Sequence, residues 1–266
     1  MAHAEESLLP LISKIAAEHG YYNPQIITNE ISSGGANYTS RLFTVIVRET
    51  NRDDLHLFAK VVKIGEKFRS KVPLTIFNTE LITYTKLWKI YQALEEENQV
   101  PEEHKLLFTK CYGCDPTLYK EVLVLENLLE QGFGPYNRFE SVDWEYASAA
   151  ITELTKLHAL SFVYSEKYPT KFEKFLDDIK LVWQEGMLDI MTGGSVVTAL
   201  QTVGPEHREP LERYLNIYMK DLLERFFAPI RRTVIVHGDY RGSNMLHRKR
   251  KVSVKDILLE SVISDS

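Results

Sequence analysis

The 266-residue sequence has few of the features that mark secreted, membrane-spanning or nucleic-acid-binding proteins. Its only two cysteines, Cys111 and Cys114, cannot build a disulfide framework. No run approaches the roughly 18 apolar residues of a transmembrane helix, and residues 1–20 lack the basic-then-apolar pattern of a secretory signal. The net charge is −5, so no basic excess favours nucleic acid or an anionic membrane. We expect a cytoplasmic protein that binds neither.

The overall composition, with 44% hydrophobic and 26% charged residues, is that of an ordinary globular protein. A chain of this length can form one large domain or two lobes. Strand patterns dominate up to residue 126, whereas long helical patterns dominate from residue 141 onward. The sequence therefore predicts an α+β fold with a β-rich N-terminal lobe (residues 1–126) and a mainly helical C-terminal lobe (residues 127–266). The cleft between two such lobes is a common ligand site.

The first third of the sequence alternates between one helical pattern and several strand patterns. Apolar spacing predicts a helix over residues 8–19, which Gly20 ends. Two strands are expected on either side of a glycine-containing loop at residues 32–39. The second of these strands and the next one form a predicted β-hairpin over residues 40–63.

A long helix is predicted after Pro73. Its apolar positions recur at steps of three and four residues: Phe77, Leu81, Tyr84, Trp88 and Tyr91. Two strands are then expected around a Gly-Cys-Asp-Pro turn at residues 113–116. In the C-terminal part, helical patterns cover residues 141–165, 170–190 and 205–228, strand patterns cover residues 233–236 and 252–260, and the basic run at 247–251 is interpreted as a solvated turn.

The segment "VIVHGDYRGSN" (residues 234–244) carries the strongest chemical signal. Its β-branched run predicts a buried strand, which leads into His-Gly-Asp and, five residues after Asp239, into Asn244. A carboxylate on such a loop can accept a proton from a hydroxyl, and an amide oxygen can bind magnesium, as phosphoryl transfer requires. The alternative is a plain Gly-Asp turn that Asn244 caps. Four fixed positions rarely arise together by chance, so we favour phosphoryl transfer.

A lysine on an interior strand is the second candidate. Lys60 lies in "LFAKVV", whose apolar neighbours predict burial, and a buried lysine needs an anionic partner. Glu80 on the following helix is the natural candidate, and together the two side chains could hold nucleotide phosphates. The alternative is that Lys60 lies on an edge strand and extends to water.

Two further segments are candidates for nucleotide contacts. The loop "SSGGANYTS" lacks the Gly-Lys-Ser/Thr of a Walker loop, but its backbone N–H groups could cover phosphates. The alternative for this loop is an ordinary hairpin connection. The segment "LVLEN" (residues 123–127) ends a strand where a Gly- and Pro-containing connector begins, and its backbone groups could bind an adenine edge.

The remaining candidates favour structural roles. Cys111 and Cys114 have the spacing of a redox or zinc pair, but the sequence has no second pair of ligands. Two small buried side chains are therefore expected there. His158 falls on the buried face of its predicted helix, which favours a packed, hydrogen-bonded histidine over a catalytic one.

The order of these motifs resembles that of the protein-kinase-like small-molecule kinases, which include choline kinases and aminoglycoside phosphotransferases. More narrowly, the sequence is similar to the ecdysteroid-kinase-like family, found mainly in insects. The resemblance rests on "GGANYTSRLFTV", "FNTELITYTKLW", "LVLENLLEQGFGPYNRF", "LHALSF" and "HGDYRGSNML" and spans residues 8–250. It implies a two-lobed protein-kinase-like fold and ATP-dependent phosphorylation of a hydroxyl group on a small molecule, such as a steroid or a xenobiotic.

The resemblance also implies a role for each candidate residue. Asp239 would be the catalytic base and Asn244 a Mg²⁺ ligand, while Lys60 would contact the ATP phosphates and Glu80 would hold Lys60. The loop that covers the phosphates would contain Gly34, Gly35 and Asn37, and the hinge that meets adenine would contain Glu126, Asn127 and Leu128. His237 would support the catalytic loop.

The sequence departs from the family pattern after residue 250. The family continues through a strand into an Asp-Phe motif whose Asp is the main Mg²⁺ ligand, and then into further helices. Here "VSVKDILLE" resembles that strand but runs into "SVISDS", and no Asp-Phe follows. Asp256 lies at the wrong end of this strand, Glu260 is nearer the expected place and Asp265 lies in the terminal tail, and neither Glu260 nor Asp265 is a good replacement for the missing Asp. The resemblance therefore implies a C-terminally truncated member with an incomplete Mg²⁺ site. Its alternative function is that of a non-catalytic, pseudokinase-like binding protein.

Overall fold

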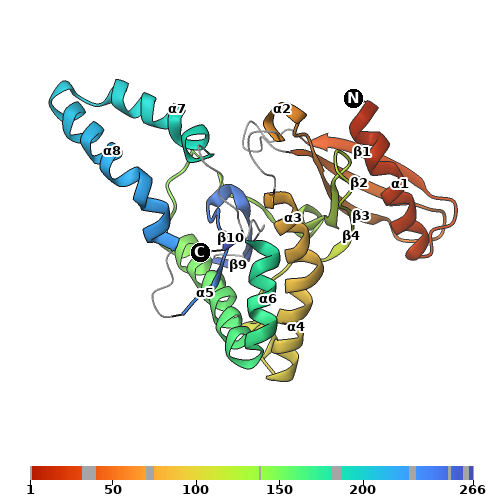
Figure 1. The fold of residues 1–266 in the computed structure, drawn as a ribbon. Coiled ribbons are helices and arrows are strands. Elements are labelled where there is room, and N and C mark those ends of the chain that lie inside the picture. The colour runs from red at the N-terminus through yellow and green to blue at the C-terminus, as the bar shows by residue number, and fades with distance from the viewer. Residues whose placement is uncertain are drawn as a thin grey trace.

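A five-stranded antiparallel sheet forms the first part of the protein, and helices dominate the rest (Figure 1). The computed structural model describes residues 2–31, 40–69, 75–137, 139–180, 187–227, 232–250, 253–259 and 264–265. The sheet contains β1 (Gln25–Ile31), β2 (Ser40–Arg48), β3 (Leu55–Val62), β4 (Cys111–Asp115) and β5 (Val122–Glu126), in the order β1-β2-β3-β5-β4. The predicted hairpin over residues 40–63 is confirmed as β2 and β3.

The two faces of this sheet pack against different helices. Leu57, Ala59 and Val61 alternate along β3 onto one face, where they join the buried side chains of α1 (Ala2–Glu18). Each of the large apolar side chains buried there contributes about 1.5–3 kcal/mol. The opposite face, which carries Lys60 and Val62, packs against α3 (Thr75–Ile82).

A nearly continuous helix follows the sheet's third strand and carries the five predicted apolar positions, all of which are buried. It consists of α3, a π-helical turn (Thr83–Leu87) and α4 (Trp88–Glu97). The π turn accommodates an extra residue and so rotates the buried stripe. As a result Phe77, Leu81 and Tyr84 face the sheet, whereas Trp88 and Tyr91 join the core of the helical part.

The helical part is built on α5 (Trp144–Lys167) and α6 (Pro169–Ile179), which pack against α4. The helices α7 (Met187–Thr202) and α8 (Pro205–Phe227) form a hairpin on the side away from the five-stranded sheet (Figure 1). The prediction of one helix over residues 170–190 was wrong, since α6 ends at Ile179 and a separate helix begins at Met187. No helix among the described residues is long and apolar enough to cross a membrane.

Small sheets surround the predicted catalytic segment. β7 (Ile235–Val236) pairs with β10 (Ser264–Asp265), and β8 (Met245–Arg250) pairs with β6 (Gly134–Pro135) and β9 (Ser253–Leu259). The basic run at 247–251 was predicted as a turn, but residues 247–250 lie in β8. Its partners β6 and β9 supply the hydrogen bonds, so this strand depends on distant pairing rather than on local composition.

The predicted α+β class is correct, and the arrangement is compatible with a two-lobed kinase-like fold. The predicted turn at residues 113–116 begins later than expected, because Gly113 and Cys114 lie inside β4. A β-bulge at that point shifts the register between β4 and β5. The division into lobes at residues 126 and 127 remains a prediction.

Candidate active site

One half of the candidate site is a buried ion pair on regular elements. Lys60 lies on β3, the central strand, and its Nζ is 2.6 Å from Oε1 of Glu80 on α3. The side chains are only 14% and 6% exposed. The alternation of β3 points Lys60 toward α3, so the fold supplies the anionic partner that a buried ammonium group needs.

A second buried ion pair, which the sequence analysis missed, stabilises the same region. The guanidinium group of Arg69 on α2 (Glu66–Arg69) donates to both carboxylate oxygens of Glu121, at 2.6 and 3.0 Å, and to the carbonyl of Ile64. The only sequence signal for it is an acidic residue directly before the apolar run of β5. This bidentate pair holds α2 against the start of β5.

The other half of the site is a loop after β7. The run of β-branched residues forms that short strand, and Gly238 then reverses the chain at a φ of 80°, a conformation that favours glycine. His237 is buried, and its Nδ1 accepts a hydrogen bond from the backbone N–H of Asp239 at 3.4 Å. A 3₁₀ turn (Gly242–Asn244) then leads into β8.

Asn244 fixes the Asp239 carboxylate from one side. Its Nδ2 donates to Oδ2 of Asp239 at 2.7 Å and to the Asp239 carbonyl at 3.0 Å. Both partners are pure acceptors, so the amide nitrogen must face them and the amide oxygen must face away. Arg241 donates its Nε to the same carboxylate oxygen, Oδ2, at 3.1 Å. The other oxygen, Oδ1, receives neither of these two donors.

Aromatic side chains anchor this loop to the helical part. The hydroxyl group of Tyr240 donates to the carbonyl of Ala150 on α5, and its ring packs edge-on against His237 at 5.3 Å. Tyr146 lies beneath Gly242, 4.3 Å from the ring of Tyr136. Burial raises the pKa of Tyr146 to about 12 and also raises the pKa of Tyr240. Both phenols therefore stay neutral at physiological pH.

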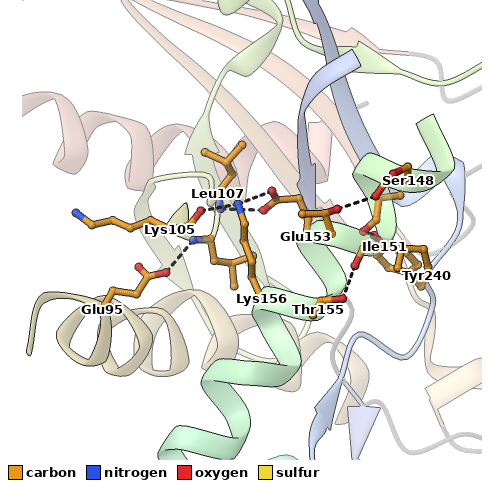
Figure 2. A network of polar contacts seen from close by, with 12 residues as sticks. Glu95, Lys105, Leu107, Ser148, Ile151, Glu153, Thr155, Lys156 and Tyr240 are labelled. Carbon is orange, nitrogen blue, oxygen red and sulfur yellow. Dashed lines mark hydrogen bonds and ion pairs between the residues drawn. The ribbon is translucent and has the colours of Figure 1, made fainter. Parts of the chain in front are cut away.

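A polar network ties α4 and the segment before β4 to α5 (Figure 2). Glu95 on α4 accepts the backbone N–H of Leu106 at 2.8 Å. Lys156 on α5 donates to the Lys105 carbonyl at 3.0 Å and pairs with Glu153 at 2.7 Å. The helix that carries Glu80 at one end is thus connected through its other end to α5, which also anchors the loop around Asp239.

The predicted hinge follows β5. The Glu126 amide donates to the Lys110 carbonyl at 2.9 Å, and the Asn127 amide donates to the His56 carbonyl at 3.2 Å. The buried Asn127 side chain accepts from Leu129 N and caps a short 3₁₀ turn (Leu128–Gln131). Asn127 is therefore occupied in turning the chain.

The comparison with known families agrees with this arrangement. The sequence model of the ecdysteroid kinase-like family matches residues 34–259. The chain belongs to the ecdysteroid kinase-like family. No curated protein matches it. Membership in this family indicates a kinase-like phosphotransferase of small molecules.

The family match takes in all the predicted site residues, and the structure places most of them. It brings Lys60 next to Glu80, and Asp239 next to Asn244. The predicted phosphate-covering residues Gly34, Gly35 and Asn37 lie outside the described residues, as does Glu260. Arg241 was missed; the signal that could have revealed it is a basic residue two positions after the Asp of the family's His-Gly-Asp motif.

The remaining predicted positions fit structural roles in this family member. Cys111 and Cys114 pack on the α3 face of the sheet, and burial raises the pKa of Cys111 to about 11. A thiol with this pKa is protonated at physiological pH and is a weak nucleophile. Among the described residues, no three His, Cys, Asp or Glu side chains gather into a metal site. His158 is half-buried rather than fully packed, its buried Nε2 has no hydrogen-bond partner among the described residues, and burial lowers its pKa.

Proposed function

We propose that this protein transfers the γ-phosphoryl group of ATP to a hydroxyl group of a small molecule. The observation that carries the proposal is the fixed orientation of Asp239. Asn244 and Arg241 both hold its Oδ2, and this leaves Oδ1 as the oxygen to which an acceptor hydroxyl can donate. A carboxylate positioned in this way suits a general base in phosphoryl transfer.

In the proposed reaction, the acceptor oxygen forms a bond to the γ-phosphorus while the bond from that phosphorus to the β-phosphate oxygen breaks. The hydroxyl proton moves to Oδ1 of Asp239, and ADP leaves. Lys60 would contact the ATP phosphates, and Glu80 would keep the ammonium group in position. The loop with Gly34, Gly35 and Asn37 would cover the phosphates, and backbone groups of residues 126–128 would meet adenine.

The chemistry of Asn244 fits Mg²⁺. Its amide oxygen faces away from Asp239, and Mg²⁺ is commonly bound by one or two protein oxygens together with substrate phosphates and water. We assign Asn244 as a protein ligand of Mg²⁺ on this basis. When bound, Mg²⁺ would neutralise charge on the β- and γ-phosphates.

The acceptor that we propose is a small molecule with a hydroxyl group, such as a steroid or a xenobiotic.

A direct test of the proposed function begins with thermal melts of the purified protein alone, with ATP, and with ATP and MgCl₂. ATP should raise the melting temperature and Mg²⁺ should raise it further, because a ligand that binds only the folded state stabilises it. Transfer of ³²P from [γ-³²P]ATP to a panel of steroid and xenobiotic alcohols then tests catalysis. Nucleotide binding without transfer to any alcohol of a broad panel would support a pseudokinase-like binding protein instead. A melting temperature that neither ATP nor Mg²⁺ changes would contradict both functions.

A further inference from the structure

In the proposed function Arg241 only helps to hold Oδ2 of Asp239. It lies two residues after Asp239 on the same loop, and its side chain is 53% exposed. Its Nε donates to Oδ2 of Asp239 at 3.1 Å, and its backbone carbonyl accepts from Asn244 N at 2.8 Å. A cation thus lies beside the carboxylate whose other oxygen, Oδ1, would take the acceptor proton.

Holding the Asp239 carboxylate uses only part of the hydrogen-bonding capacity of Arg241. An ion pair between side chains that are 53% and 44% exposed contributes little to folding. Asn244 already holds the same carboxylate oxygen at the shorter distance of 2.7 Å, and it also holds the Asp239 carbonyl at 3.0 Å. Among the contacts of the described residues, Arg241 uses only one of the five N–H donors of its guanidinium group for this pair.

The geometry of the proposed reaction places the phosphoryl group within reach of these donors. An acceptor hydroxyl hydrogen-bonded to Asp239 lies about 3 Å from the carboxylate, and the attacked phosphorus lies about 3 Å beyond that oxygen. During transfer, negative charge is spread over the three equatorial oxygens of the phosphoryl group. A planar guanidinium group matches such oxygens in a bidentate way.

We propose that Arg241 is a further catalytic residue, which contacts the γ-phosphoryl group of bound ATP through N–H donors that Asp239 leaves unused. This assignment rests on the proposed function. It makes Arg241 a source of positive charge on the acceptor side of the phosphoryl group. ADP lacks the γ-phosphate, so Arg241 should distinguish ATP from ADP.

The test is equilibrium binding of MgATP and MgADP to four forms of the full chain: wild type, Arg241→Ala, Arg241→Lys and Arg232→Ala. Arg232→Ala is the matched control, because Arg232 lies just before β7 in the chain, is 67% exposed and pairs with Glu166 at 2.8 Å, away from Asp239. We expect Arg241→Ala to weaken MgATP binding by about 10- to 100-fold and MgADP binding by no more than about 2-fold. Arg241→Lys should recover part of the loss, and Arg232→Ala should match wild type.

Once an acceptor alcohol is identified, the kcat of each variant provides a second measurement. Arg241→Ala should lower kcat by about 10²- to 10³-fold, below the range known for arginine residues that stabilise phosphoryl transfer, because this arginine shares its charge with Asp239. A melt of each variant checks that it folds, and Arg241→Lys keeps the test valid if Arg241→Ala does not fold.

Three results would overturn the assignment. If Arg241→Ala weakens the binding of MgATP and MgADP equally, or weakens neither, the arginine does not contact the γ-phosphate. If only the KM of the acceptor changes, the arginine binds the acceptor. If the wild-type protein binds neither nucleotide, the proposed function fails, and the inference about Arg241 fails with it. The wild-type measurement distinguishes this case from a failure of the inference alone.

Discussion

The two halves of the candidate site are held in opposite ways. Lys60 and Glu80 come from a central strand and a helix, and their side chains are 14% and 6% exposed. Asp239 and Arg241 come from one short loop, and their side chains are 44% and 53% exposed. The first pair is enclosed by the core, whereas the second is open to solvent.

This difference predicts that substitutions of Lys60 or Glu80 change mainly the stability of the fold, whereas substitutions of Asp239 or Arg241 change mainly the reaction. A buried ion pair becomes costly when one partner is removed, because the other charge stays buried without compensation. An exposed loop carboxylate contributes little to folding, so its removal should affect the reaction almost alone. Substitutions in the two halves therefore offer separate readouts of the same site.

The largest effect should come from Asp239→Asn. The amide keeps the shape of the side chain but cannot accept the hydroxyl proton, so kcat should fall by about 10²- to 10⁴-fold, which corresponds to about 3–5 kcal/mol of barrier. The melting temperature should change by less than about 2 °C, because the side chain is 44% exposed and the amide can keep its hydrogen bond with Asn244.

Asp177→Asn on α6 is the matched control, since Asp177 is an exposed aspartate of the helical part. It should leave both kcat and the melting temperature unchanged. Full turnover by Asp239→Asn would remove the proposed base.

The second effect concerns the buried half. Glu80→Ala leaves the Lys60 ammonium group without its carboxylate and should destabilise the fold by about 3 kcal/mol, at the low end for a buried pair because Lys60 is 14% exposed. The expected fall in melting temperature is about 6–12 °C. Asp178→Ala, which breaks the exposed Lys86–Asp178 pair, should cost less than about 1 kcal/mol.

The double variant Lys60→Met/Glu80→Leu sharpens this comparison. Replacing both charges with apolar side chains of similar size should recover most of the stability that Glu80→Ala loses. It should not recover ATP binding, since the proposed phosphate contact is gone. A double variant that is as unstable as Glu80→Ala would show that the pair stabilises the fold through more than mutual compensation.

The contacts Lys60–Glu80 and Asp239–Asn244 were easier to predict from the sequence than the elements around them, for physical reasons. Lys60 was predictable because an apolar strand makes a buried lysine, which must have a partner. Asp239 and Asn244 were predictable because their spacing is local. The π turn at residues 83–87 and the strand β8 were missed, since the first departs from the regular helical period and the second depends on pairing with distant β6 and β9.

A third prediction tests the junction at which α4 and the segment before β4 meet α5, which we call the joint. Glu153 on α5 is 6% exposed, and it pairs with Lys156 while accepting Leu107 N at 3.5 Å. Glu153→Ala should lower stability by about 1–2 kcal/mol, and the melting temperature by about 2–8 °C, because it leaves buried polar groups unsatisfied. Glu166→Ala on the same helix is the control, since Glu166 is 61% exposed, and its melting temperature should stay within about 1 °C of wild type. Equal effects of the two substitutions would mean that the network does not hold the joint.

The smallest effect concerns Glu95, at the other end of that joint. Burial raises the pKa of Glu95 above its ordinary value, and the hydrogen bond from Leu106 N and the charges of Lys105 and Lys156 only partly oppose this. A carboxyl group whose pKa is raised by folding favours the folded state in its protonated form. Its contribution is complete below the unfolded pKa of about 4.3 and is lost as the pH rises through the folded pKa.

Glu95→Gln should therefore stabilise the protein at neutral pH, because the neutral amide keeps the acceptor oxygen for Leu106 N and avoids burying a charge. We expect a gain of about 1–3 °C at pH 8 that disappears toward pH 4, measured by melts across this range. Glu96→Gln, at the exposed neighbouring position, should show no such pH dependence. A gain for Glu95→Gln that is constant with pH would mean that the substitution acts through packing. A loss at pH 8 would mean that the charged carboxylate is needed to hold the segment between α4 and β4, so the joint, like Lys60 and Glu80, would depend on a compensated buried charge.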